Sequence, residues 1–210
     1  AGLCKALKLA CPEGIVNSEE TMTESPKYQV TQKHGAFELR QYAPYIKAEV
    51  AVSGGSYRAA IYKGFGILAD YIFGNNIAAE KVAMTSPVQV EESRKIAMTS
   101  PVTVSGEGNY TVAFSMPSEY RLETLPLPKN ESIRFVEVPA QMVAATRVAS
   151  FYREQAIEKA KSQLADWVNQ AGLQPTGEFS VAGYNPPWVP NFLARSEVMV
   201  AVETPSLNPS

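Results

Sequence analysis

The chain has 210 residues, 45% of them apolar, and a formal net charge of −2. This length allows one large domain or two small ones, and the apolar content is sufficient for a substantial core. The slightly acidic charge argues against a nucleic-acid partner, whose phosphates favour a basic protein face. The sequence has no apolar run of about 18 residues or more, so no transmembrane segment is expected.

Two cysteines and one histidine limit the chemistry that the chain can support. A zinc site needs more Cys or His at close spacing, and a Ser-His-Asp triad would have to use His34. Cys4 and Cys11 are either small buried residues or a bridged pair. In a regular helix their Cα atoms would lie roughly 10 Å apart, which is too far for a disulfide.

Residues 1–27 are expected to form an N-terminal extension and linker. Leu3, Leu7 and the two cysteines share one face of a possible helix that Pro12 ends. The segment is either a docking helix or the end left when a targeting segment is removed. Processing is favoured, and it suggests the bacterial periplasm or the chloroplast or thylakoid lumen.

Three strands are predicted next, over residues 28–33, 36–42 and 45–52. These runs are rich in β-branched and aromatic residues, and Gly35 and Pro44 punctuate them. His34-Gly35 is a plausible hairpin turn. The simplest interpretation of His34 is therefore a solvated turn residue.

Residues 57–73 predict a helix whose apolar residues are not confined to one side. One apolar face recurs at helical spacing and consists of Tyr57, Ile61, Phe65, Leu68 and Ile72. The opposite side carries Ala59, Tyr62, Ala69 and Phe73. A helix that is apolar nearly all round is either buried or offers a second face to something else, such as a flat apolar ligand.

The hexapeptide AMTSPV occurs twice, at residues 83–88 and 97–102. Two strands, 81–90 and 95–104, are predicted to pair about a turn at Glu91–Arg94. Such a hairpin places Met84 opposite Pro101 and Met98 opposite Pro87, with both thioethers buried.

The rest of the chain repeats the order of strands, helix and strands. Residues 110–116 and the long run 132–148 are predicted to be extended, and Ser150 is a plausible N-cap for a helix over 151–171. Strands follow at 178–184 and 196–203. This order predicts an α+β fold of two related halves with antiparallel sheets.

Four motifs in this order resemble the SOUL haem-binding protein family: the doubled AMTSPV after an aromatic helix, VAFSMPSEY, IRFVEVPA and YNPPWVPNFLARSEV. The resemblance runs from about Tyr28 to Glu203. It implies a SOUL haem-binding domain over residues 28–203, with residues 204–210 as a C-terminal tail. It also implies two repeats, each an antiparallel sheet with a helix, forming a distorted β-barrel flanked by two helices.

The resemblance further implies non-covalent binding of haem or another tetrapyrrole, with no assigned reaction. The family's pocket carries over to Tyr62, Phe65 and Ala69 on the first helix and to Trp188 and Val189 in the loop before the last strand. Leu68, Phe192 and Arg195 are added from their spacing. Animal members place basic and Met side chains in this pocket, whereas this chain has Tyr62, Phe65 and Val189.

Several alternatives stay open at this point. The propionates of a haem would be met by Lys63, Arg58 or Arg195, and His34 is a candidate axial ligand. The chain is either a tetrapyrrole binder for storage, transport or buffering, or an accessory subunit of a larger assembly, photosynthetic or in an envelope. A protein partner would dock on helix 57–73 or the N-terminal segment. An enzymatic role is not expected, because no motif brings acid–base groups together.

Overall fold

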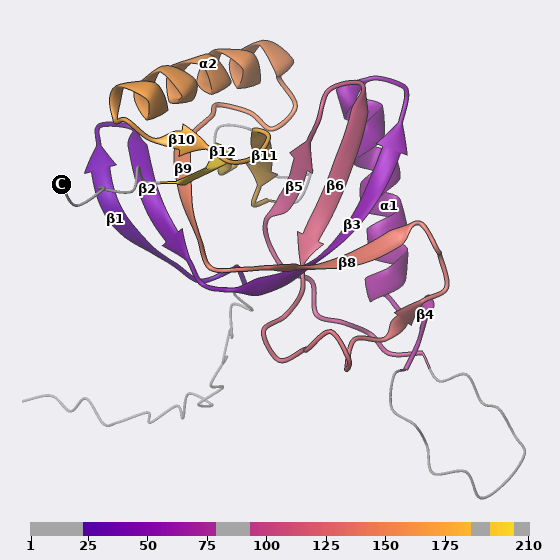
Figure 1. Ribbon diagram of the computed structural model, residues 1–210. Helices are drawn as coiled ribbons and strands as arrows, with labels where there is room; N and C mark the ends of the chain where they lie inside the picture. Colours follow the sequence, from indigo (N-terminus) through magenta and orange to yellow (C-terminus); the bar gives the residue numbers. More distant parts are fainter. Residues whose placement is uncertain (1–22, 79–92, 186–193, 204–210) are drawn as a thin grey trace, which may run out of the picture.

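The computed structural model describes residues 23–78, 93–185 and 194–203 (Figure 1). In chain order the elements are β1 (Tyr28–His34), β2 (Phe37–Tyr42), β3 (Tyr45–Ser53), α1 (Tyr57–Ile72), β4 (Asn76–Ile77), β5 (Val102–Ser105), β6 (Asn109–Ser115), β7 (Leu127–Pro128), β8 (Ile133–Val138), β9 (Gln141–Arg147), α2 (Glu154–Gln170), β10 (Gln174–Pro175), β11 (Ser180–Gly183) and β12 (Ser196–Glu203).

The sheet is built from two halves of the same design. Outward from the seam between β5 and β11, one half runs β5-β6-β3-β8 and the other runs β11-β12-β9-β2. The strand pairs along this path are antiparallel. In each half a helix follows the third strand from the seam: α1 follows β3 and α2 follows β9. The predicted α+β fold of two sheet-plus-helix halves is therefore confirmed.

The sheet curls, because its two halves are joined at the seam and again near their outer strands. β8 and β9 are separated in the chain only by Pro139 and Ala140, yet they belong to opposite halves of the sheet. The two helices cover one face of this curled sheet (Figure 1). One continuous core lies beneath them and includes Leu68 of α1, Leu164 of α2 and Val104 and Val181 at the seam. We call the opposite sheet face, which carries Thr103, Ala182 and Met199, the inner face.

Local sequence explains where α1 begins and why it lies close to the sheet. The Ser56 side chain accepts a hydrogen bond from the Ala59 N–H and caps the helix. A Cβ added to Gly64 would lie 2.5 Å from a methyl of Val112 on β6, so this glycine permits the close approach. The helix ends before Gly74, whose φ of 118° few other residues adopt.

The second helix begins later than predicted. Ser150 was expected to cap a helix over 151–171, but α2 starts at Glu154 with Arg153 in the cap position and no side-chain cap. Ser150 instead accepts a hydrogen bond from the Tyr152 N–H within the preceding turn. That turn places Phe151 in the core, where it is 8% exposed.

The predicted Met–Pro hairpin is wrong for its second strand. Residues 95–101 do not form a strand, and β5 is already paired with β6 on one edge and β11 on the other. Thr99 donates to the Ser115 carbonyl, and Met98 is 40% exposed instead of buried. Residues 81–90, which include the first AMTSPV copy, lie outside the described residues.

The described end of the N-terminal extension is attached to the fold. The Glu24 carbonyl accepts from the Ser100 N–H, and the Ser25 and Ser100 hydroxyls lie 2.8 Å apart. The Glu24 carboxylate also accepts from the Ser118 N–H. Residues 23–27 therefore contact the domain that they were expected only to precede.

Candidate functional site

The outward side of α1 carries apolar side chains that the core does not use. Tyr62 is 51% exposed and Phe73, the residue that caps the helix, is 60% exposed. Phe65 lies between this side and the core, with its ring edge-on to Phe114 of β6 at 5.4 Å. We call the surface made by Arg58, Tyr62, Phe65, Ala69 and Phe73 the outer face of α1.

A cation and two parallel rings form the best-defined part of this face. Tyr62 stacks with Tyr152, with 6.3 Å between ring centroids and 14° between ring planes. The Arg58 guanidinium lies 5.9 Å from the Tyr62 ring and 5.4 Å from the Tyr152 ring. Burial raises the pKa of the Tyr152 phenol, so this ring stays neutral and keeps an apolar face. The cluster thus combines flat apolar area with a positive charge.

The cluster is tied to the ends of the loop before β12 by a chain of aromatic contacts. Tyr152 packs edge-on against Phe151, and the Phe151 ring lies 3.0 Å from where Gly183 would carry a Cβ. Just beyond Gly183, the Tyr184 N–H donates to the Arg195 carbonyl and the Arg195 N–H donates to Asn185 Oδ1. The two described ends of this loop therefore meet where β11 and β12 pair, beside the β11 residue that contacts Phe151.

The structure separates the residues that the sequence assigned to one pocket. Tyr62, Phe65 and Ala69 share the outward side of α1, although Ala69 is only 8% exposed. Leu68 is 0% exposed and belongs to the core beneath the helix. Trp188, Val189 and Phe192 lie outside the described residues.

Arg195 is committed to a network on the inner face instead of to α1. Its guanidinium donates to Glu197 at 2.9 Å and to the Tyr28 hydroxyl at 3.0 Å, and it lies 4.2 Å from the Tyr184 ring centroid. Arg40, 3% exposed, donates to both Glu197 carboxylate oxygens. Burial alone would raise the pKa of Glu197, but hydrogen bonds from Arg40, Tyr184 and Arg195 hold it below its usual value.

His34 does not belong to the outer face of α1. It is exposed at the end of β1, where Gly35 with φ of 59° makes the turn into β2. β1 is the edge strand of the half that carries α2, whereas α1 lies on the other half (Figure 1). One ring cannot contact both His34 and α1 in this arrangement.

Two kinds of feature are absent from the described ranges. No group of three or more His, Cys, Asp or Glu residues within 23–78, 93–185 and 194–203 is arranged to hold a metal ion. Among the same residues, no helix is both long and apolar enough to cross a membrane.

Sequence reasoning gave Tyr152 no role at the pocket. Tyr152 follows Phe151 directly before α2, 90 positions after Tyr62, and no local pattern indicates that the two rings stack. The one available signal was the aromatic pair itself, because two adjacent aromatic residues before a helix seldom both face the core.

Comparison with known proteins identifies relatives over most of the chain. A family model described as SOUL heme-binding protein matches residues 23–201. Heme-binding protein 2 of Mus musculus is 29% identical over 181 residues, covering 81% of this chain and 82% of the mouse protein. Heme-binding protein 2 of Homo sapiens is 29% identical over 161 residues, covering 73% and 72% of the two chains.

Solved structures share the fold at low sequence identity. The EcmrR C-terminal domain superposes with a TM-score of 0.57 at 15% identity, covering 84% of this chain and 98% of that domain. A hydrolase from Listeria innocua superposes with a TM-score of 0.52 at 6% identity, covering 82% and 94%. These likenesses establish the fold alone.

Proposed function

Because the chain belongs to the SOUL haem-binding protein family, we propose that it binds haem or a related tetrapyrrole on the outer face of α1. The proposed binding is non-covalent and involves no catalysed reaction. The observation that carries this proposal is the stacked pair Tyr62 and Tyr152 with the Arg58 guanidinium beside both rings. A flat apolar ring with acidic substituents needs this combination of area and charge.

The described residues fit a tetrapyrrole in two respects. Tyr62, Phe65 and Phe73 offer apolar contact, and buried apolar area contributes roughly 25 cal/mol per Å². Arg58 supplies the guanidinium that pairs with a propionate carboxylate, whereas Arg195 is held by Glu197. A ring held by area and one ion pair is exchangeable, which suits storage, transport or buffering of the ring.

Within this proposal the remaining predicted residues have distinct parts. Leu68 supports the helix from beneath. Trp188, Val189 and Phe192 lie outside the described residues and stay predictions as contacts of the ring. In this proposal His34 is not the axial ligand, and its place in the β1–β2 turn, on the other half of the sheet from α1, supports this.

A hemin titration followed by absorbance tests the proposal. We expect Tyr62→Ala to weaken binding at least tenfold, about 1.4 kcal/mol. Arg58→Gln should weaken hemin more than a porphyrin whose propionates are esterified. The matched controls are Val30→Ala, which removes another exposed apolar side chain, and Arg121→Gln, which removes another exposed cation. Both controls and His34→Ala should bind as the unmodified protein does.

Two results would overturn the proposal. If the unmodified chain gives no saturable Soret change with hemin at micromolar protein, it is not a haem binder. If His34→Ala abolishes the Soret change while Tyr62→Ala leaves it intact, the ring binds at the β1–β2 turn.

The second candidate function, an accessory subunit, is favoured by a different observation. Leu127 is 59% exposed and pairs with Ile77 directly after α1, so apolar surface continues beyond Phe73. We propose that a protein partner would dock on this extension. Size-exclusion of the protein from its native source distinguishes the two roles: a partner-bound species that Phe73→Ser and Leu127→Ser both dissociate supports docking, whereas a monomer argues against it.

A further inference from the structure

The inner face of the sheet lines a half-open cavity that the proposed haem site does not use. Its volume is about 460 Å³, and its walls come from both halves of the sheet, including Tyr45 of β3, Val136 of β8 and Met199 of β12. A second cavity of about 720 Å³ adjoins it and shares Pro26, Tyr45, Ser115, Glu137, Val138 and Pro139. Cavities of about 300–1,000 Å³ are the usual size of small-molecule sites.

One wall of the cavity is a row of hydroxyls across three neighbouring strands. Ser180 of β11 is paired with Ser105 of β5, and Ser105 is paired with Thr111 of β6. All three line the cavity and are partly exposed. Among the described residues, none of these three side chains has a hydrogen-bond partner, so they are available to a ligand.

The surrounding walls are apolar and aromatic. Val136 and Val138 come from β8, and Val143 and Met199 come from the other half of the sheet. The Tyr42 and Tyr45 rings lie 6.4 Å apart at 49° and both border the cavity. Burial raises the pKa of Tyr45 to about 12, so its phenol is a neutral hydrogen-bonding group at physiological pH.

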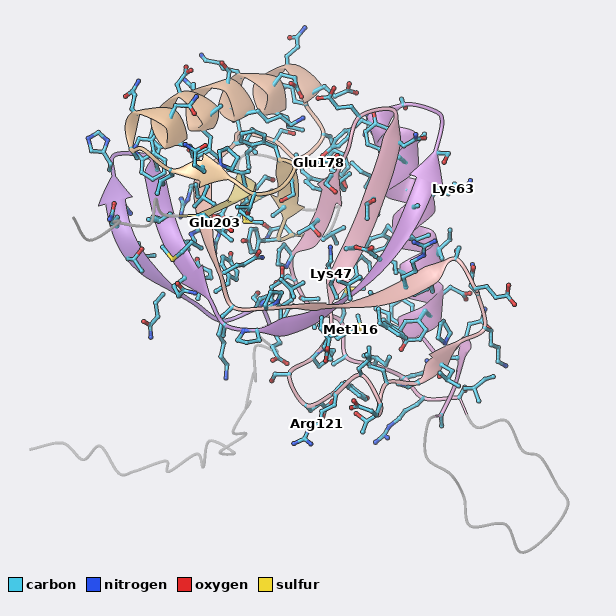
Figure 2. The ribbon with its side chains drawn as sticks, viewed as in Figure 1. Lys47, Lys63, Met116, Arg121, Glu178 and Glu203 are labelled. Carbon is cyan, nitrogen blue, oxygen red and sulfur yellow. The ribbon has the colours of Figure 1, made fainter. Side chains whose placement is uncertain are left out.

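The charges around the cavity argue against an ionic ligand. Lys47 is paired with Glu49 at 2.8 Å, and Glu137 and Glu178 are exposed. Figure 2 shows Lys47 and Glu178 on the two halves of the curled sheet. An anionic ligand would meet no free cation among the described walls, because Lys47 is already paired. The carboxylates of Glu137 and Glu178 are exposed and screened by solvent, so they would not offset the desolvation of a cationic ligand. A neutral ligand avoids this cost.

We propose that the inner cavity is a second binding site for an uncharged, hydroxylated aromatic molecule. The ligand would have the Tyr42 and Tyr45 rings on one side and the Ser180–Ser105–Thr111 row on the other. The ring of such a ligand contacts the valines and tyrosines, and its hydroxyls exchange hydrogen bonds with the row. The site is independent of α1, because the two helices cover the opposite face of the sheet.

Three probes that share one ring system test the ligand class. They are 2,6-dihydroxynaphthalene, 6-hydroxy-2-naphthoate and 6-hydroxy-2-naphthylmethylammonium, each followed by equilibrium dialysis against the full chain. We expect saturable binding of the neutral diol and at least tenfold weaker binding of both ions. Absence of saturable diol binding up to its solubility, or tighter binding of either ion, overturns the proposal.

Substitutions locate the site. Ser180→Leu fills the cavity and should weaken diol binding at least tenfold, whereas Ser53→Leu makes the same change at an exposed strand position outside the cavity and should have no effect. Thr111→Val removes one hydroxyl without changing side-chain volume and should weaken binding by about two- to tenfold. Equal diol binding by Ser180→Leu and the unmodified protein, or by Thr111→Val if Ser180→Leu does not fold, overturns the location.

Measuring hemin and diol binding by the same two variants distinguishes the second site from the proposed haem site. Ser180→Leu should retain hemin binding, and Tyr62→Ala should retain diol binding. Diol binding that hemin displaces competitively would show one shared site and overturn the second one.

Discussion

The two helices occupy equivalent positions in the two halves, yet their outward sides differ in kind. Both bury an apolar stripe on the same face of the sheet, with Leu68 of α1 and Leu164 of α2 each 0% exposed. The exposed residues of α2 are all polar, whereas those of α1 include Tyr62, with Phe73 exposed at its C-terminal cap. The fold therefore needs one apolar stripe per helix, and α2 shows that no second stripe is required.

Because α2 folds with a wholly polar exposed side, the exposed apolar residues of α1 are not needed for stability. Exposed apolar side chains are common singly, but Tyr62 and Phe73 are 11 residues apart and lie on the same side of one helix. Tyr152 of the opposite half is recruited to the same surface by stacking on Tyr62. Residues from both halves therefore build one surface on α1, with no counterpart on α2, as expected for a binding site.

The largest effect on stability should come from the buried apolar stripes beneath the two helices, in which α1 and α2 are alike. Leu68→Ala and Leu164→Ala should each lower the free energy of unfolding by about 2–5 kcal/mol, through lost burial and the cavity left behind. Urea denaturation followed by circular dichroism measures both values. A loss below about 1 kcal/mol at one position would show that this helix is not part of the common core.

The next effect comes from the two glycines of α1, which face opposite ways. Gly64→Ala should cost about 1–3 kcal/mol, because its Cβ would overlap Val112 and push the helix from the sheet. A Cβ added to Gly66 would meet no atom within 4 Å, so Gly66→Ala should stabilise by up to about 1 kcal/mol. Thermal unfolding of both variants gives the comparison.

A double variant provides the control for this contact. Val112→Ala makes room for the new methyl, so Gly64→Ala should cost less in that background than alone. An equal cost in both backgrounds would place the strain of Gly64→Ala elsewhere in the helix.

The sequence predicted the helices and the two-half order because both depend on local periodicity. It could not predict which strand edges pair, since pairing is decided by the whole sheet. The repeated AMTSPV suggested pairing between its two copies, but β5 lies at the seam with β6 and β11 on its edges. Arg195 was added to the pocket from its spacing, although Glu197, two residues later, indicated its partner.

A smaller effect on stability is expected from the two buried tyrosines of α1. The buried residues of α2, in contrast, are all aliphatic. The Tyr71 hydroxyl donates to the Pro126 carbonyl at 2.8 Å, so Tyr71→Phe should cost about 1–2 kcal/mol. The Tyr57 hydroxyl is buried without a partner in the described structure, so Tyr57→Phe should be neutral or slightly stabilising. Urea denaturation measures both, and equal losses would show that Tyr57 has a partner after all.

The smallest effect on stability should come from making the outside of α1 resemble that of α2. Tyr62→Gln with Phe73→Gln removes two exposed side chains and the exposed contact between Arg58 and the Tyr62 ring, so the cost should be about 0.5–1 kcal/mol. The same variant should lose hemin binding and keep 2,6-dihydroxynaphthalene binding. Asn169→Tyr places an exposed aromatic ring on α2 and should change neither stability nor hemin binding, because its neighbours at helical spacing, Ala165, Asp166 and Leu173, are neither aromatic nor cationic. A stability loss above about 2 kcal/mol in the double variant would show that part of the chain covers this face, in which case the apolar side of α1 is core and the contrast between the helices disappears.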